Sequence, residues 1–186
     1  LWQHHQVRSE LVEVFEFLKK RINHHHEPLR SRPEVPLQVH ARYTRIEILA
    51  AFHPLDKAKV AAWQTGVRWL PDEKADLLAF TLDKTSGRFS PSTRYRDYAN
   101  SRKLIHWESQ GIVREASDTG ERYKNHDSMG SSIYLFARES VKDRSFWFLG
   151  PARFVRSEGE KPMAITWELA NELPGDLYAS FAAAVA

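Results

Sequence analysis

The stretch FTLDKTSGRFSPSTRYRDYANSRKLIHWESQ (Phe80–Gln110) begins in one β-rich run and contains a second one. These two runs, Leu77–Leu82 and Leu104–Trp107, are short, apolar and bounded by polar residues, which is typical of strands. Between them the chain is rich in Arg, Ser and Tyr. Short strands joined by irregular loops of this length favour a curved sheet or a partly closed barrel.

Further strands are expected on both sides of this stretch. Their composition is the same, with β-branched or aromatic residues between Gly, Pro, Asp and Ser. The runs are Leu37–Tyr43, Ile133–Ala137, Phe146–Leu149 and Ala164–Leu169. We therefore predict a predominantly antiparallel, curved sheet for the second part of the chain.

Helices are expected before the sheet. Apolar residues recur at helical spacing from Val7 to Ile22 and predict an amphipathic helix over residues 5–22. Thr44 and Glu47 form a capping box, which predicts a helix from there to Phe52. A second short helix is expected over Asp56–Gln64, ending at Gly66. The fold class is therefore α+β.

The segment Asn23–Pro36 contains three His and three Pro and reads as a loop or linker. We therefore divide the chain into an amphipathic helical arm with its linker, residues 1–36, and a main domain, residues 37–186. The first residue is Leu rather than Met, so we expect the sequence to be part of a longer protein.

Composition excludes several classes of protein. The chain has no Cys, which excludes a disulfide scaffold, a thiolate zinc site and a cysteine nucleophile. No apolar run approaches a membrane span of roughly 20 residues, and no signal-peptide pattern is present. A cytoplasmic protein without a membrane partner is expected.

Positive charge is concentrated in one segment. Between Lys84 and Lys103 there are six basic residues and one acidic residue, and with Asp83 the balance is 6 − 2 = +4, against +3 for the whole chain. Aromatic rings alternate with these cations. Rings that can stack on a base, beside cations that neutralise phosphates, point to nucleic-acid binding.

Two catalytic or metal-binding alternatives are weaker. The run His24–His26, with His4 and His5, lacks a ligand spacing, since consecutive His side chains rarely converge on one ion. Asp76 with the Asp83–Lys84 pair faintly resembles the carboxylate–lysine site of restriction nucleases, but the acid-x-Lys spacing is absent. We expect no metal, no cofactor and no catalytic residue.

Seven blocks, in order, resemble a domain at the C-terminal end of bacterial DEAD/DEAH-type helicases. They are HARYTRIEILAAF (His40–Phe52), WQTGV (Trp63–Val67), the Phe80–Gln110 stretch, GERYKNH (Gly120–His126), IYLFARE (Ile133–Glu139), FWFLGPA (Phe146–Ala152) and KPMAITWEL (Lys161–Leu169). The family more often has HWQSQ where this chain has HWESQ, so Glu108 departs from its pattern.

The resemblance implies a fold and a function. Many of these helicases also carry a phospholipase-D-like nuclease, and some are type IV restriction enzymes that cut DNA containing modified cytosine. The C-terminal region of those enzymes is regarded as the target-recognition module, similar to the SRA or PUA-like β-barrels. By this resemblance the chain binds double-stranded DNA and reads modified cytosine, with 5-methylcytosine as the first candidate, by flipping the base out of the duplex. It is expected to serve helicase and nuclease domains of the same polypeptide in antiphage defence.

Capture of a flipped base suggests roles for individual residues. Tyr95, Tyr98 and Trp107 are expected to stack on a flipped base, although Tyr98 and Trp107 could instead belong to the core. Asp97 is expected to accept the exocyclic amine of cytosine, with His106, Ser109 or Gln110 completing the base-edge contacts. The residues expected to bind phosphate are Arg42, Arg45, Lys84, Arg88, Arg94, Arg96, Arg102 and Lys103. A helicase accessory domain that grips single strands or junctions is the alternative.

Overall fold

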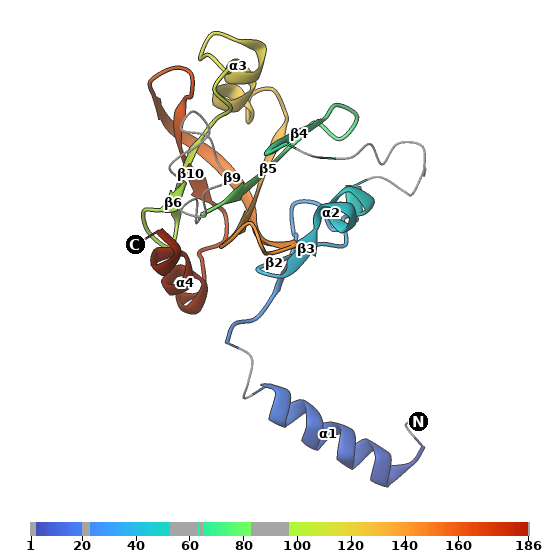
Figure 1. Ribbon diagram of the computed structural model, residues 1–186. Helices are drawn as coiled ribbons and strands as arrows, with labels where there is room; N and C mark the ends of the chain where they lie inside the picture. The colour runs from blue at the N-terminus through green and yellow to red at the C-terminus, as the bar shows by residue number, and fades with distance from the viewer. Residues whose placement is uncertain (1–2, 20–22, 53–62, 64, 83–96, 186) are drawn as a thin grey trace.

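The computed structural model describes residues 3–19, 23–52, 63, 65–82 and 97–185 (Figure 1). Its helices are α1 (His5–Lys19), α2 (Arg45–Phe52), α3 (Asp118–Asn125) and α4 (Gly175–Val185). Its strands are β1 (Glu27–Pro28), β2 (Gln38–Val39), β3 (Arg42–Thr44), β4 (Val67–Leu70), β5 (Ala75–Thr81), β6 (Tyr98–Ala99), β7 (Leu104–Glu108), β8 (Ser132–Arg138), β9 (Ser145–Glu158) and β10 (Ala164–Leu169).

An eight-stranded sheet dominates the described residues. Its strand order is β4-β5-β8-β9-β10-β7-β6, and β3 pairs with β9 beside this path. The α+β class is confirmed. The sheet is predominantly antiparallel, as predicted, and among the described strands β5 and β8 form its one parallel pair. In the described part of the chain it is also open, with β4 and β6 at its two ends, so it is not closed into a barrel.

Two apolar clusters lie on opposite faces of the central strands. Alternate residues of β8 separate cleanly: Ile133 and Leu135 belong to the larger cluster, and Tyr134 and Phe136 to the smaller one. Successive side chains of a strand point to opposite faces, so a strand buried on both faces is apolar throughout. The larger cluster also buries one face of β7 and β10. The opposite face of these two strands is therefore the outer face of the sheet.

Strand β9 is much longer than the predicted Phe146–Leu149. The register shifts opposite Leu135 and Phe136, where Gly150 has φ +95°. Such a bulge bends a strand without ending it. The Gly150–Pro151 pair, read as a strand end from sequence, therefore lies inside β9. A second register shift, opposite Thr166 and Trp167, bends the far end of β9. The strand can therefore pair with both β8 and β10.

The N-terminal region differs from the expected arm and linker in one respect. No residue of α1 is buried, and Figure 1 shows this helix projecting away from the sheet. Leu29 and Val35, however, are buried in the smaller cluster, so part of the expected linker is packed on the domain. The expected strand Leu37–Tyr43 is split into β2 and β3, because His40 has φ +68°.

The capping box is confirmed. Thr44 donates its backbone N–H to Glu47 Oε2 at 2.7 Å, and α2 ends at Phe52 as predicted. The helix expected over Asp56–Gln64 lies outside the described residues, except for Trp63. Helices α3 and α4 were not predicted. None of the helices in the described ranges has the length and apolarity needed to cross a bilayer.

Candidate functional site

A pocket of about 190 Å³ opens on the outer face of β6, β7, β10 and β9, the face opposite the larger apolar cluster. Strand pairing brings its residues together, because Tyr98 pairs with His106, His106 with Thr166, and Thr166 with Arg156. Residues paired across strands lie side by side on one face. The lining residues are Tyr98, Asn100, His106, Arg156, Glu158, Ala164 and Thr166.

Two stacked rings form one side of the pocket. The rings of Tyr98 and His106 lie 4.6 Å apart between centroids, at an interplanar angle of 21°. Burial lowers the pKa of His106, while the charges of Glu108 and Glu158 oppose that shift more weakly. The imidazole is therefore neutral at pH 7. The pair offers a flat aromatic surface, with Tyr98 at its exposed side.

Polar groups without partners line the rest of the pocket. Thr166 is only 6% exposed, yet its hydroxyl makes no hydrogen bond within the described residues. The same holds for the side-chain amide of Asn100 and for the ring nitrogens of His106. Thr166 is buried, His106 half-buried and Asn100 exposed, so all three side chains can take a ligand in place of water. At the rim, Arg156 Nη1 lies 3.0 Å from Glu158 Oε1, and both side chains are exposed.

The structure shows a structural contact for Asp97, and its expected base contact stays a prediction. This residue is 4% exposed and does not line the pocket. Its Oδ1 accepts a hydrogen bond from the backbone N–H of Glu108 at 2.9 Å, which holds the start of β6 against the end of β7. Asp97 shapes the pocket from behind rather than contacting its contents.

Trp107 is also misplaced in the sequence prediction. It is 3% exposed and packs in the larger cluster against Tyr123 and Trp167, with ring centroids 5.7 and 6.4 Å away. Strand alternation sends it to the face opposite His106. No base can stack on it, so the alternative core assignment holds for Trp107 but not for Tyr98.

Ser109 and Gln110 lie past the end of β7 and do not line the pocket. Ser109 is fully buried, and its hydroxyl accepts from Met163 N at 2.9 Å and donates to Gln110 O at 3.2 Å. These bonds join β7 to the start of β10. Neither Ser109 nor Gln110 is brought to the pocket, and their base-edge roles stay predictions.

The structure describes only some of the residues that were predicted to bind DNA. Outside the described residues lie one predicted stacking residue, Tyr95, and four predicted phosphate-binding residues, Lys84, Arg88, Arg94 and Arg96. Arg102 donates from Nε to the backbone oxygen of Leu173 at 2.7 Å, which ties the β6–β7 turn to the segment before α4. Lys103 Nζ lies 3.2 Å from Glu168.

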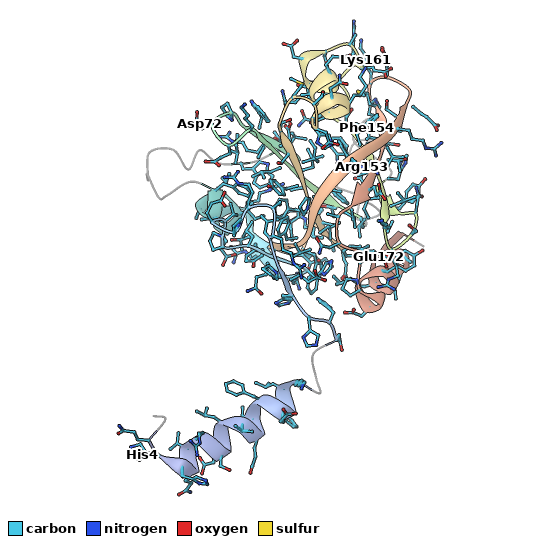
Figure 2. All side chains as sticks on the ribbon, turned by 180° about the vertical axis from the view of Figure 1, so that it is seen from behind. His4, Asp72, Arg153, Phe154, Lys161 and Glu172 are labelled. Carbon is cyan, nitrogen blue, oxygen red and sulfur yellow. The ribbon has the colours of Figure 1, made fainter. Side chains whose placement is uncertain are left out.

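The cations of the outer face are paired with carboxylates among the described residues. Glu168 pairs with both Lys103 and Arg153, and Glu158 pairs with Arg156. Figure 2 labels Arg153 and its neighbour Phe154 on β9, and these adjacent residues divide as the strand alternates: Arg153 is exposed, whereas Phe154 packs on the larger cluster. The positive excess of the sequence thus lies mainly in the segment beyond the described residues.

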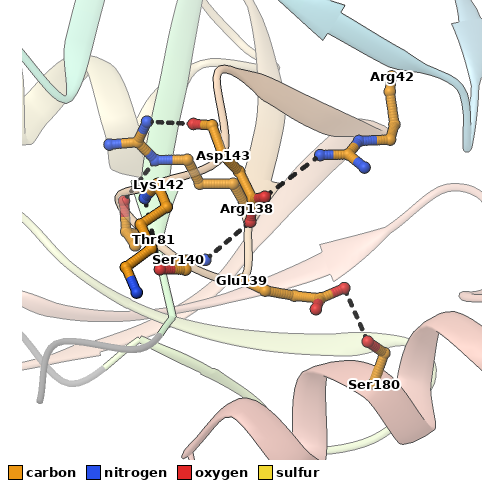
Figure 3. Close-up of polar contacts among 8 residues, drawn as sticks. All are labelled: Arg42, Thr81, Arg138, Glu139, Ser140, Lys142, Asp143 and Ser180. Carbon is orange, nitrogen blue, oxygen red and sulfur yellow. Dashed lines mark hydrogen bonds and ion pairs between the residues drawn. The ribbon is translucent and has the colours of Figure 1, made fainter. Parts of the chain in front are cut away.

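Arg42 and Arg45 stand at another edge, where β3 pairs with β9. Arg42 lies over the Trp147 ring at 5.2 Å and 3.7 Å from Asp143 Oδ1 (Figure 3). Arg45 lies over Trp63 and Phe146. Arg42 and Arg45 do not line the pocket, so the basic, aromatic edge that they form is a separate surface.

The nuclease-like residues do not assemble. Asp76 is fully buried and accepts two bonds from Arg122, at 2.6 and 3.1 Å. Burial raises the pKa of Asp76, and the Arg122 charge opposes that shift. Asp83 and Lys84 lie outside the described residues. Asp76 therefore fixes α3 to β5.

The histidine run also has a packing role. His24 Nδ1 lies 2.7 Å from Asp176 Oδ2, and its Nε2 lies 3.1 Å from the backbone oxygen of His40. Within the described part of the chain, no three His, Asp or Glu side chains are placed to hold a metal ion.

Sequence reasoning missed the residues that β9, β10 and the β6–β7 turn bring to the pocket: Asn100, Arg156, Glu158, Ala164 and Thr166. One signal was available, because Thr166 stands between Ile165 and Trp167 in a predicted strand. Alternation puts it on the opposite face from two large apolar residues. The pairing of β10 with β7 could not be read from the sequence.

The comparisons with known proteins give a family and a remote structural likeness. The fold is similar to a crystal structure of KRYPTONITE in complex with mCHG DNA and SAH, with a TM-score of 0.43 and 10% identity. The match covers 73% of this chain and 32% of that one. A search of curated proteins finds no match.

A family model covers most of the main domain. The model of the Domain of unknown function (DUF3427) matches residues 37–181, which include every strand of the large sheet and all residues of the pocket. The chain therefore belongs to the DUF3427 family.

Proposed function

We propose that this domain binds DNA and takes an unstacked nucleobase into the pocket on the outer face of β6, β7, β10 and β9. The observation that carries the proposal is the pocket itself, in which the Tyr98–His106 ring pair lies beside unpartnered polar groups. A flat ring with polar edges is the ligand that such walls suit. The basic segment between Lys84 and Lys103 supplies the charge that DNA binding requires.

The energetics of base capture are favourable enough. Flipping a nucleotide out of a duplex costs a few kcal/mol. A base stacked on an aromatic side chain regains about 1–3 kcal/mol. Hydrogen bonds to the base edge must supply the rest. Stacking on Tyr98 alone returns about as much free energy as base flipping costs, so recognition depends on the polar contacts.

We infer that these contacts select cytosine. Cytosine presents an exocyclic amine beside two acceptors on its pairing edge. Glu158 can accept from the amine, in the role first expected of Asp97, while Asn100 and Thr166 can donate to the acceptors. Thymine lacks the amine and would leave the Glu158 carboxylate opposite a carbonyl oxygen. Because Glu158 lies at the exposed rim beside Arg156, this mismatch costs less than the about 1–3 kcal/mol of a buried unpaired group.

We infer further that the base is modified cytosine, with 5-methylcytosine as the first candidate. The Ala164 side chain and the Thr166 methyl group are apolar walls for a methyl group. Full burial of one methyl contributes about 0.8 kcal/mol, so discrimination requires close contact.

In this proposal the domain is a non-catalytic recognition module of a restriction system. The sequence blocks that resemble helicase-associated domains support this context, with helicase and nuclease domains of the same cytoplasmic polypeptide acting on the DNA. The carboxylates favour the same view, since Asp76 is locked by Arg122 and Asp97 holds backbone.

A binding competition tests the proposal. Duplexes with 5-methylcytosine, 5-hydroxymethylcytosine or unmodified cytosine compete at one salt concentration, together with the single strands. Preference for a modified duplex that is lost in Tyr98→Ala and kept in Tyr98→Phe supports the pocket. Equal affinity for all duplexes and tighter binding of single strands would instead favour a general helicase accessory domain.

A further inference from the structure

A second charged site lies at the edge of the sheet where β3 pairs with β9 and β8 ends. Phe146 carries two guanidinium groups, with Arg45 at 5.2 Å and Arg138 at 4.7 Å from the ring centroid. Arg45 also lies over Trp63 at 5.5 Å. Arginine on an aromatic face gains a cation–π attraction that keeps its planar donor edges directed outward from the ring.

Both arginines are held in place by hydrogen bonds. Arg138 donates from Nε to Thr81 Oγ1 at 2.9 Å and from Nη1 to the backbone oxygen of Asp143 at 2.6 Å (Figure 3). Arg45 is the first residue of α2 and donates from Nη2 to the backbone oxygen of Thr65 at 3.2 Å. Fixed side chains of this kind lose little freedom when a ligand binds.

Neither guanidinium has a carboxylate partner within the described residues. Burial lowers the pKa of Arg45, and the charge of Arg138 lowers it further. Burial lowers the pKa of Arg138 as well, while the charge of nearby Asp143 opposes that shift. Arginine nevertheless stays charged. The Nε of Arg45 is buried without a hydrogen-bond partner in the described structure. Two half-buried cations on one ring create a site that an anion would stabilise.

The nearby acids are already engaged. Asp143 lies near Arg42 and accepts from the backbone N–H of Ser140 at 3.0 Å. Glu139 accepts from Ser180 at 2.7 Å (Figure 3), and Glu47 caps α2 through Thr44. Lys142 and Arg144 add positive charge in the same turn between β8 and β9. Cations therefore outnumber acids around this edge.

We infer that Arg45 and Arg138 form a binding site for a phosphoryl group. A guanidinium pairs with phosphate through two parallel N–H donors, a geometry that suits a planar fork better than a point charge. The inference rests on the proposed function in taking the phosphate to be that of the DNA backbone. Free phosphate has the same chemistry, and the experiment separates these sources.

The first arm of the experiment follows the arginine Nε–H resonances of the ¹⁵N-labelled protein. Inorganic phosphate is titrated against chloride at matched ionic strength. We expect saturable shifts of the Arg45 and Arg138 signals and none for exposed Arg114. Signals of Arg45 and Arg138 that move neither with phosphate nor with an unmodified duplex overturn the inference. This arm uses the unaltered protein, so it does not depend on the folding of a variant.

The second arm compares Arg45→Gln with Arg114→Gln, which removes the same charge from an exposed position. For an unmodified duplex, Arg45→Gln should reduce the slope of log Kobs against log salt by about 0.9, as expected for one lost phosphate contact. Arg114→Gln should leave the slope unchanged. Equal slopes in both variants would contradict a DNA phosphate at this site.

The two proposals can fail separately. Phosphate shifts at Arg45 without any duplex binding by the unaltered protein would keep the phosphoryl site and refute the DNA-binding function. Selective binding of modified duplex with no response at Arg45 and Arg138 would do the reverse.

Discussion

His106 and Trp107 are neighbours on β7, yet they belong to different parts of the molecule. Trp107 packs among Tyr123 and Trp167 in the larger apolar cluster. His106 lies on the outer face, stacked on Tyr98 and lining the pocket. Both are ring-bearing residues in one predicted strand. The face on which a ring lies, rather than its type, decides whether it can meet a ligand.

The same division extends to the adjoining strand. On β10, Ile165 and Trp167 are fully buried in the cluster, while Thr166 between them lines the pocket. The inner face supplies the free energy of folding through buried area. The outer face keeps polar groups without partners, which costs stability and leaves them available. Substitutions on the two faces should therefore affect different measurements.

The largest effect is expected on the inner face. Trp107→Ala removes a large buried ring and should lower the free energy of unfolding by about 3–5 kcal/mol. Urea denaturation followed by tryptophan fluorescence or circular dichroism measures it. A loss below about 1 kcal/mol would mean that Trp107 does not support the core.

Asp97 should behave as a buried structural residue. Asp97→Ala leaves the backbone N–H of Glu108 without its acceptor, so unfolding should become easier by about 1–3 kcal/mol. The matched control is Asp72→Ala, at an exposed turn position, which should change stability little. Normal stability of Asp97→Ala with selective loss of modified-DNA binding would return Asp97 to the base-contact role.

Tyr98→Ala tests the outer face. It should reduce binding of a modified duplex by about 1–3 kcal/mol, the contribution of one stacked base. Its unfolding free energy should fall much less than that of Trp107→Ala, because Tyr98 is 36% exposed. Fluorescence anisotropy measures the binding, and Tyr98→Phe, which keeps the ring, is the control.

The smallest effect concerns acid. Because burial lowers the pKa of His106 below the 6.5 of an exposed imidazole, the native state binds fewer protons than the unfolded chain as pH falls below 6.5. Stability due to this residue is therefore lost on acidification. His106→Gln should flatten the pH profile slightly. Buried His40, with its pKa lowered to about 4, contributes equally to both proteins and cancels in the difference. An identical profile in His106→Gln would contradict a half-buried imidazole.

Local patterns predicted much of the fold. The strand Ala164–Leu169 and the capping box at Thr44 match the structure, because alternation and capping depend on neighbouring residues. The split of Leu37–Tyr43 could not be foreseen, since the left-handed conformation of His40 depends on tertiary contacts. Helix α3, DTGERYKN, was missed because it contains few apolar residues.

The site was predicted less well for a related reason. Of the residues predicted from charge and aromatic content, Tyr98 and His106 line the pocket, but composition does not distinguish the two faces of a strand. Only the pairing of β7 with β6 and β10 reveals that Trp107 faces inward and that Thr166 joins His106. Cross-strand partners such as Arg156 lie about 50 residues away in sequence, and no local pattern links them.

The most direct test of the account is base unstacking in a bound duplex. A 2-aminopurine placed beside one 5-methylcytosine becomes more fluorescent when its neighbour leaves the stack. We predict an increase on binding of the unaltered protein, a much smaller one with Tyr98→Ala, and recovery with Tyr98→Phe. Tight binding of the methylated duplex with no fluorescence change would contradict a pocket that receives a flipped base.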